Sequence, residues 1–146
     1  MQSTREPKFS TFMNVALALA KQSSCIRRHV GCVLTDKYHR IIGTGYNGTH
    51  RGASHCIDSP CAGAGLPSTT GLELCEAIHA EQNALMMCHD VMQVDSCFVT
   101  VSPCLHCMKM LLNTTCREIY YLQAYDEVAV EMWRLNKRSA FNVVNV

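Results

Sequence analysis

The sequence lacks an apolar run of the length that a membrane-spanning helix requires, about 18 residues. Its first ten residues, MQSTREPKFS, lack the apolar core of a secretory signal. An excess of charge is also missing, because the formal net charge is only +1, which argues against a basic surface for nucleic acid. We therefore expect a cytoplasmic protein that binds neither membranes nor nucleic acid and acts on a small molecule.

Internal repeats, low-complexity tracts and linkers are absent as well, and 146 residues suit one domain, which we expect over residues 1–146. Hydrophobic periodicity predicts a helix over 9–20 and a hairpin of two strands at 30–35 and 41–46. Further along the chain it predicts a helix over 75–88, a strand at 96–101, a helix over 104–113, a strand at 118–122, a helix over 126–135 and an edge strand within 141–146. Such alternation favours a sheet covered by helices on both faces.

Cysteine is abundant, with ten residues in the chain. In a cytoplasmic protein of this size, cysteines bind metal or lie buried as thiols more often than they form disulfides. The segment from Asn47 to about Leu74 shows no helix or strand pattern, and so long an irregular connection needs a function or a covalent or metal staple. Cysteine spacing therefore decides between metal ligands and packed thiols.

The stretch VSPCLHC places Cys104 and Cys107 directly after a predicted strand, where two thiolates can bind one metal ion. His79, in the stretch CEAIHAEQNALMMC, offers a third ligand. Three protein ligands leave the fourth position of a tetrahedral zinc ion open to water, which is typical of catalytic zinc. Glu81 could then take a proton from that water and pass it to the substrate.

His79 and Glu81 are two residues apart and would point to nearly opposite sides of an ideal helix. The site should therefore lie at the first turn, with the N-termini of both helices directed at the ion. Considered alone, His79 could be a packed core histidine, and Cys104 with Cys107 a redox pair or half of a structural zinc site. Together, His-x-Glu followed by Pro-Cys-x-x-Cys is the signature of zinc deaminases.

On these motifs the chain resembles the cytidine and deoxycytidylate deaminase superfamily, and more closely its deoxycytidylate (dCMP) deaminase branch. Stretches over residues 23–127 carry the resemblance: SSCIRRHVGCVL, IIGTGYNGTHRG, HAEQNAL, VTVSPCLHC and YYLQAYDE. The resemblance implies a three-layer α/β/α fold around a mixed sheet of about five strands. It also implies hydrolytic deamination of dCMP to dUMP and ammonia by a zinc-activated hydroxide, with Glu81 transferring protons, and hence a supply of dUMP for thymidylate synthesis.

The resemblance further implies four substrate-binding residues. Asn47 would lie by the sugar and base, Ser102 would line the base pocket, and Tyr125 would lie near the sugar and phosphate. Arg27, which we favour over Arg28, would bind the phosphate, because a guanidinium suits phosphate oxygens. From the residues alone, Asn47 could equally be a turn residue, Tyr125 a surface anchor and Arg27 a solvated side chain.

Some members of the superfamily bind a second, structural zinc ion, and the resemblance places its ligands at Cys25, Cys56, Cys61 and Cys75. Four thiolates would close a tetrahedron and hold the long irregular segment in place. His55 could replace one of the cysteines, and a set of free thiols is the alternative.

The four other cysteines stand in apolar strand or helix patterns, and we interpret them as packed thiols: Cys32, Cys88, Cys97 and Cys116. His106, between the two zinc cysteines, is interpreted as pointing away from the metal.

Relatives in this branch are commonly hexamers, activated by dCTP and inhibited by dTTP, with magnesium accompanying the triphosphate. His89 and Asp90 stand here where regulated relatives carry a basic residue, and an acidic group should repel a triphosphate unless magnesium intervenes. Two alternatives to a dCMP deaminase stay open: a zinc deaminase of another nucleobase, nucleoside or nucleotide, and a non-catalytic zinc-binding assembly module. The presence of Glu81 favours an enzyme, because a structural zinc site needs no proton shuttle.

Overall fold

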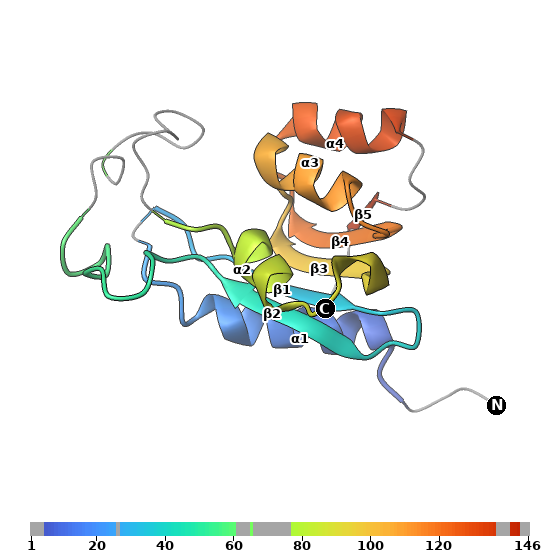
Figure 1. Cartoon of the computed structure of the whole chain (residues 1–146), viewed down its shortest axis with the longest axis horizontal. Helices are drawn as coiled ribbons and strands as arrows, with labels where there is room; N and C mark the ends of the chain where they lie inside the picture. Colours follow the sequence, from blue (N-terminus) through green and yellow to red (C-terminus); the bar gives the residue numbers. More distant parts are fainter. Residues whose placement is uncertain (1–4, 26, 61–64, 66–76, 137–140, 144–146) are drawn as a thin grey trace.

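The computed structural model describes residues 5–25, 27–60, 65, 77–136 and 141–143 (Figure 1). Its elements, in chain order, are α1 (Lys8–Ala20), β1 (Gly31–Thr35), β2 (Ile41–Tyr46), α2 (Ala80–Met87), the short 3-10 helix η2 (Val91–Gln93), β3 (Ser96–Val101), α3 (Leu105–Leu112), β4 (Glu118–Gln123), α4 (Glu127–Leu135) and β5 (Phe141–Val143).

The strands form one sheet in the order β2-β1-β3-β4-β5. β1 pairs antiparallel with both β2 and β3, whereas β4 pairs parallel with both β3 and β5. The predicted mixed sheet of about five strands is confirmed, including the edge strand near the end of the chain.

Side chains of the central strands alternate between two apolar layers, as the period-two pattern of a strand requires. On one face, Val33 and Phe98 pack against Met13 and Ala16 of α1. On the other face a larger core joins the intervening strand residues to α2, α3 and α4, with Trp133 of α4 fully buried in it. Figure 1 accordingly shows α1 below the sheet and the other three helices above it, which confirms the predicted three-layer α/β/α architecture.

The first turn of α2 lies unusually close to β2 because Gly45 has no side chain. A Cβ atom at Gly45 would lie only 2.3 Å from the carbonyl oxygen of Ala80, so any larger residue would push the helix off the sheet. The side-chain amide of Asn83 also donates a hydrogen bond to the Tyr46 carbonyl oxygen at 2.9 Å. These two contacts fix how far the start of α2 lies from the sheet, and therefore the position of the residue before it, His79.

The start of the irregular segment is held near α2 by backbone hydrogen bonds. Gly48 donates to the Ile78 carbonyl at 3.1 Å, and Ile78 donates back at 2.7 Å. Because this bridge keeps the backbone before α2 extended, the helix begins at Ala80, so the expected start near Cys75 is wrong. Within the described residues 47–60, no helix or strand forms, as predicted.

Three of the cysteines interpreted as packed thiols, Cys32, Cys97 and Cys116, are fully buried, and Cys88 is half-buried. None of the helices in the described part of the chain is long and apolar enough to cross a bilayer.

Candidate active site

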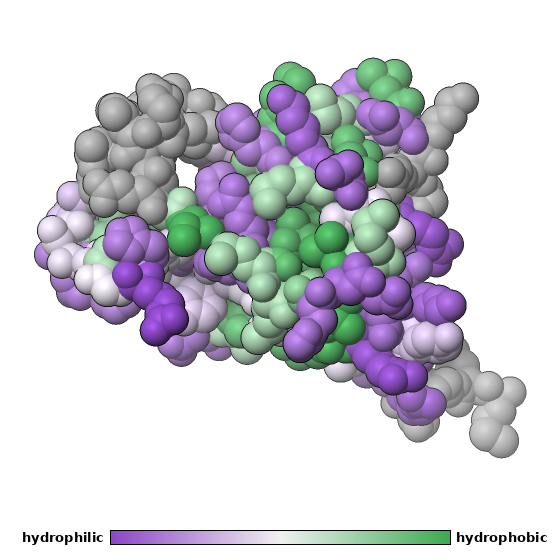
Figure 2. All heavy atoms as spheres, in the orientation of Figure 1, coloured by the Kyte–Doolittle hydropathy of each residue, from purple (hydrophilic) through white to green (hydrophobic). Residues whose placement is uncertain are grey.

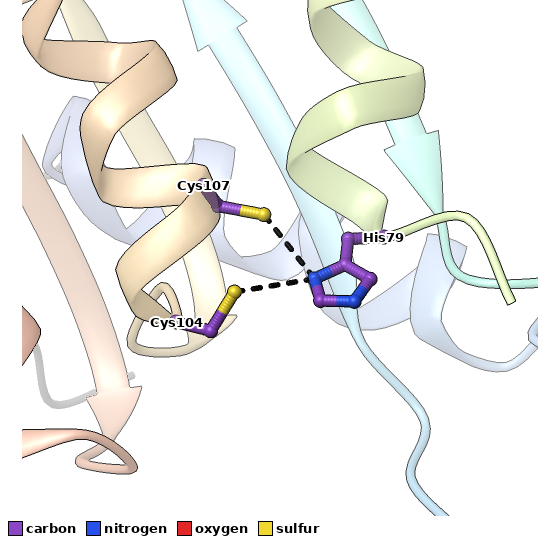
Figure 3. A group of neighbouring side chains, drawn as sticks. All are labelled: His79, Cys104 and Cys107. Atoms are coloured by element: carbon purple, nitrogen blue, oxygen red, sulfur yellow. Dashed lines mark hydrogen bonds between the residues drawn. The ribbon is translucent and has the colours of Figure 1, made fainter. Parts of the chain in front are cut away.

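Three potential metal ligands from two distant segments of the chain converge at one point (Figure 3). The Nδ1 atom of His79 lies 3.4 Å from the Cys104 sulfur and 3.2 Å from the Cys107 sulfur. No other cluster of this kind occurs among the residues that the structure describes. The sequence motifs thus come together as predicted.

Helix ends bring these side chains together. His79 is the residue immediately before α2, with an extended backbone at φ −73° and ψ 153°, and Cys104 holds the same position before α3. Cys107 and Glu81 lie in the first turns of α3 and α2. The two helices therefore present their N-termini to a shared point, which explains how His79 and Glu81 can face the same site despite their spacing.

The donor set fits zinc. With Zn–S near 2.3 Å and Zn–N near 2.0–2.1 Å in a tetrahedron, a ligand nitrogen and a ligand sulfur lie roughly 3.6 Å apart. The two observed nitrogen–sulfur separations are only slightly shorter. One nitrogen and two sulfurs would occupy three positions of the tetrahedron and leave the fourth for water.

The site also favours a cation electrostatically. A hydrogen bond with Cys107 lowers the pKa of the Cys104 thiol to about 4, against the opposing effect of burial, so Cys104 is a thiolate at neutral pH. The positive N-terminal ends of α2 and α3 stabilise such negative charge.

Glu81 is the acidic group of the site, and its side chain is almost entirely buried, with 4% of the residue exposed. Removal from water raises the pKa of this carboxyl to about 7, although the neighbouring His79 lowers it. It lies within hydrogen-bonding reach of the Cys107 thiol. A carboxyl group with a pKa near neutrality can both accept and release a proton.

The predicted substrate residues gather at the same edge of the sheet as the metal ligands. Because β3 and β4 are parallel, their carboxyl ends share one edge, where Ser102 and Tyr125 follow them. The antiparallel strand β1 begins at this edge and β2 ends there, so Arg27 and Arg28, shortly before β1, and Asn47, directly after β2, are near it too.

Asn47 is buried, and its side chain holds the chain segment before β1. Its Oδ1 accepts from the Val30 backbone N–H at 2.9 Å, and its Nδ2 donates to the Arg28 carbonyl oxygen at 2.7 Å. A role beside the sugar stays a prediction.

Ser102 is buried, and its Oγ accepts a hydrogen bond from the Tyr125 backbone N–H at 2.7 Å. The ring of Tyr125 is half-buried, and the Arg28 guanidinium carbon lies 3.8 Å from the ring centroid. Sequence reasoning favoured Arg27, and no local signal distinguishes these two adjacent arginines. Substrate contacts by Arg27, Ser102 and Tyr125 stay predictions.

The structure describes only half of the proposed second metal site. Cys25 and Cys56 are both buried, and a hydrogen bond from the Ile57 backbone N–H to the Ser24 carbonyl, at 3.0 Å, joins their two segments. The other two predicted ligands, Cys61 and Cys75, lie outside the described residues. His55 and His106 are exposed.

Known proteins that are similar to this chain belong to the family that these motifs indicate. Residues 7–123 match the family model described as the cytidine and deoxycytidylate deaminase zinc-binding region. The chain is 37% identical to the deoxycytidylate deaminase of Schizosaccharomyces pombe over 126 residues, which cover 80% of the chain and 37% of that protein. It is 35% identical to the deoxycytidylate deaminase of Mycobacterium phage D29, over 75% of the chain and 90% of the phage protein.

The fold is also similar to a crystal structure of dCMP deaminase from cyanophage S-TIM5 in complex with dCMP and dUMP. That comparison has a TM-score of 0.74 at 23% identity and covers 96% of this chain and 99% of the other. The chain spans little more than a third of the length of the two yeast relatives, from Schizosaccharomyces pombe and Saccharomyces cerevisiae, but most of the length of the phage relatives.

Proposed function

We propose, from the premise that this chain belongs to the cytidine and deoxycytidylate deaminase family, that it deaminates dCMP to dUMP and ammonia by hydrolysis. The observation that carries the proposal is the convergence of His79, Cys104 and Cys107 beside the buried carboxyl group of Glu81. The relatives named deoxycytidylate deaminase support dCMP as the substrate, and dUMP would then serve thymidylate synthesis.

The residues divide the work between metal binding and proton transfer. A zinc ion held by His79, Cys104 and Cys107 would supply water of lowered pKa next to the substrate. Glu81 takes one proton from this water and delivers it to ring nitrogen N3 while the water oxygen bonds to C4. Glu81 then passes the second proton of the water to the exocyclic amine, and ammonia leaves as the C4–N bond breaks. The near-neutral pKa of Glu81 suits both directions of transfer.

Substrate recognition is assigned to the residues at the carboxyl edge of the sheet. Asn47 contacts the sugar and base, Ser102 lines the base pocket, and Tyr125 lies near the sugar and phosphate. Arg27 binds the phosphate through charge-assisted hydrogen bonds.

The experiment that tests this function is an assay of ammonia release with dCMP, deoxycytidine, CMP, dCTP and guanine. We expect kcat/KM for dCMP to exceed that for deoxycytidine by roughly 100-fold, because charge-assisted hydrogen bonds to the phosphate are lost with the nucleoside. Equal efficiencies on dCMP and deoxycytidine would disprove phosphate recognition. Preference for another compound in the set would move the chain to another deaminase branch, and inactivity on all of them would favour a non-catalytic zinc module.

We also propose a second, structural zinc ion bound by Cys25, Cys56, Cys61 and Cys75. Support comes from the burial of Cys25 and Cys56 in two segments joined by a backbone hydrogen bond. Such an ion would tie the end of α1 to the irregular segment and to the approach to His79.

Metal analysis of the reduced, unchelated protein should then find about two zinc ions per chain. Cys56→Ser and Cys61→Ser should each lower the content towards about one and lower the melting temperature, with partial loss of activity. Cys88→Ser, which changes a half-buried thiol just after the end of α2, is the control and should keep both ions. A single ion in the wild-type protein would rule out the second site and leave the first unaffected.

We further propose that the chain, a single domain, works in the cytoplasm as a homo-oligomer, with a hexamer favoured. Exposed methionines support association: Met86 and Met87 of α2 are 76% and 59% exposed, and Met92 of η2 is 54% exposed. Figure 2 shows hydrophobic residues gathered over the region where Figure 1 places α2. Regulation by dCTP and dTTP, with magnesium, is part of the same proposal.

A further inference from the structure

A chain of contacts leads from the metal ligand His79 to Arg28. The residue before His79, Ile78, exchanges two backbone hydrogen bonds with Gly48. The neighbouring Asn47 donates its side-chain amide to the Arg28 carbonyl oxygen at 2.7 Å. The backbone of Arg28 is therefore held by residues that are themselves bonded to the segment just before α2.

A second chain of contacts leads from the metal ligand Cys104 to Tyr125. Ser102, two residues before Cys104, donates its backbone N–H to the Gln123 carbonyl oxygen at 2.8 Å. Its Oγ accepts from the Tyr125 backbone N–H at 2.7 Å. Tyr125 is thereby held from the side of the site on which α3 begins.

The two chains of contacts meet twice. At one end His79 and Cys104 approach each other in the metal group, at 3.4 Å. At the other end the Arg28 guanidinium lies over the Tyr125 ring, 3.8 Å from its centroid. The contacts therefore form a closed ring. In this ring the Arg28–Tyr125 stack lies opposite the contact between His79 and Cys104.

An arginine stacked on a tyrosine is often no more than a surface pair, and the chain contains an example. In the turn between β1 and β2, Arg40 lies 5.0 Å from the ring centroid of the exposed Tyr38. The Arg28 pair is closer, both partners are half-buried, and the Arg28 carbonyl also accepts hydrogen bonds from Asn47 and Ser23. Arg28 is thus fixed at its backbone as well as at its side chain.

We propose that Arg28 is a positioning residue whose side chain closes this ring and so presets Tyr125 for substrate. The inference rests on the proposed function, in which Tyr125 lies beside the nucleotide. Holding the tyrosine in place before the substrate arrives removes an ordering cost from binding, so Arg28 acts on KM. The metal ligands are anchored independently of Arg28, through the bonds of Ile78 to Gly48 and of Ser102 to Gln123, so kcat depends little on it.

Steady-state kinetics of Arg28→Ala with dCMP tests this assignment. We expect KM to rise about 10-fold while kcat stays within about 2-fold of the wild type, with zinc content and melting temperature preserved. Arg28→Lys keeps the charge but lacks the planar face, so it should show nearly the same rise in KM. Arg40→Ala, which removes the same kind of pair at the opposite edge of the sheet, is the matched control and should leave both constants unchanged.

A double-mutant cycle with Tyr125→Leu separates the stack from independent effects. If Arg28 acts through Tyr125, the double variant should have the KM of the Tyr125 single variant, because the stack is already lost. Additive increases in KM overturn the inference. A wild-type KM in Arg28→Lys overturns it as well, and this variant provides the test if Arg28→Ala folds poorly. Absence of dCMP turnover in the wild-type protein overturns the proposed function and this inference with it. An unchanged KM in an active Arg28→Ala enzyme overturns the inference alone.

Discussion

Replacing Glu81 by glutamine should lower kcat by about 10² to 10⁴-fold, the usual contribution of a positioned acid–base group, while zinc remains bound. Glutamine has nearly the same shape but cannot accept and release a proton at neutral pH. In the structure Glu81 is beside the metal group and does not belong to the converging set of ligands. Ammonia release and zinc content, measured on the same purified sample, check the two halves of the expectation.

The Glu81→Gln variant should fold as well as the wild type, because Glu81 is buried. Its carboxyl is largely removed from water, and a neutral amide is less costly there than a charge. Glu131→Gln, on the exposed face of α4, is the control for removing a carboxylate and should keep full activity. Near-native activity in Glu81→Gln would show that the proton is carried by another group.

Replacing Cys104 by serine should remove zinc and activity together. A serine hydroxyl is not ionised at neutral pH, whereas the Cys104 thiol, with a pKa of about 4, is ionised and can bind the metal as a thiolate. We expect the fall in activity to exceed roughly 100-fold, the upper range for residues that only support a metal ligand. Metal analysis after dialysis, followed by the dCMP assay with and without added zinc, measures both effects.

Cys88→Ser again controls for the loss of a thiol, because Cys88 is half-buried in the approach to η2 and belongs to neither proposed metal site. Full zinc content in an inactive Cys104→Ser protein would mean that Cys104 acts on the substrate and does not hold the metal.

The sequence predicted the layers well because the strand residues obey a strict alternation. Val33 and Phe98 face α1, while their neighbours Cys32 and Val99 face the other helices. It also placed the site at helix N-termini, because the two-residue spacing of His79 and Glu81 excludes any position inside a regular helix. In both cases the information is local and follows from backbone geometry.

The features that the sequence did not reveal depend on contacts between distant residues. The start of α2 is set by the bridge between Ile78 and Gly48, which are thirty positions apart and carry no periodic signal. The choice of Arg28 as the partner of Tyr125 depends on how β1 and β4 are placed at the sheet edge, and both adjacent arginines look alike in the sequence. Tertiary packing, and not propensity, decides such contacts.

The strand order has a consequence for the growing chain as it leaves the ribosome. β2, β1 and β3 are neighbours in the sheet, and they emerge together with all four residues of the metal and proton-transfer group before any part of β4. A nascent chain that has emerged as far as Cys107 therefore already contains the three residues proposed to bind the metal ion, His79, Cys104 and Cys107. Gln123 and Tyr125, which hydrogen-bond to Ser102, are synthesised afterwards. The contacts that hold this side of the proposed substrate site can therefore form only after the proposed metal ligands are present in the chain.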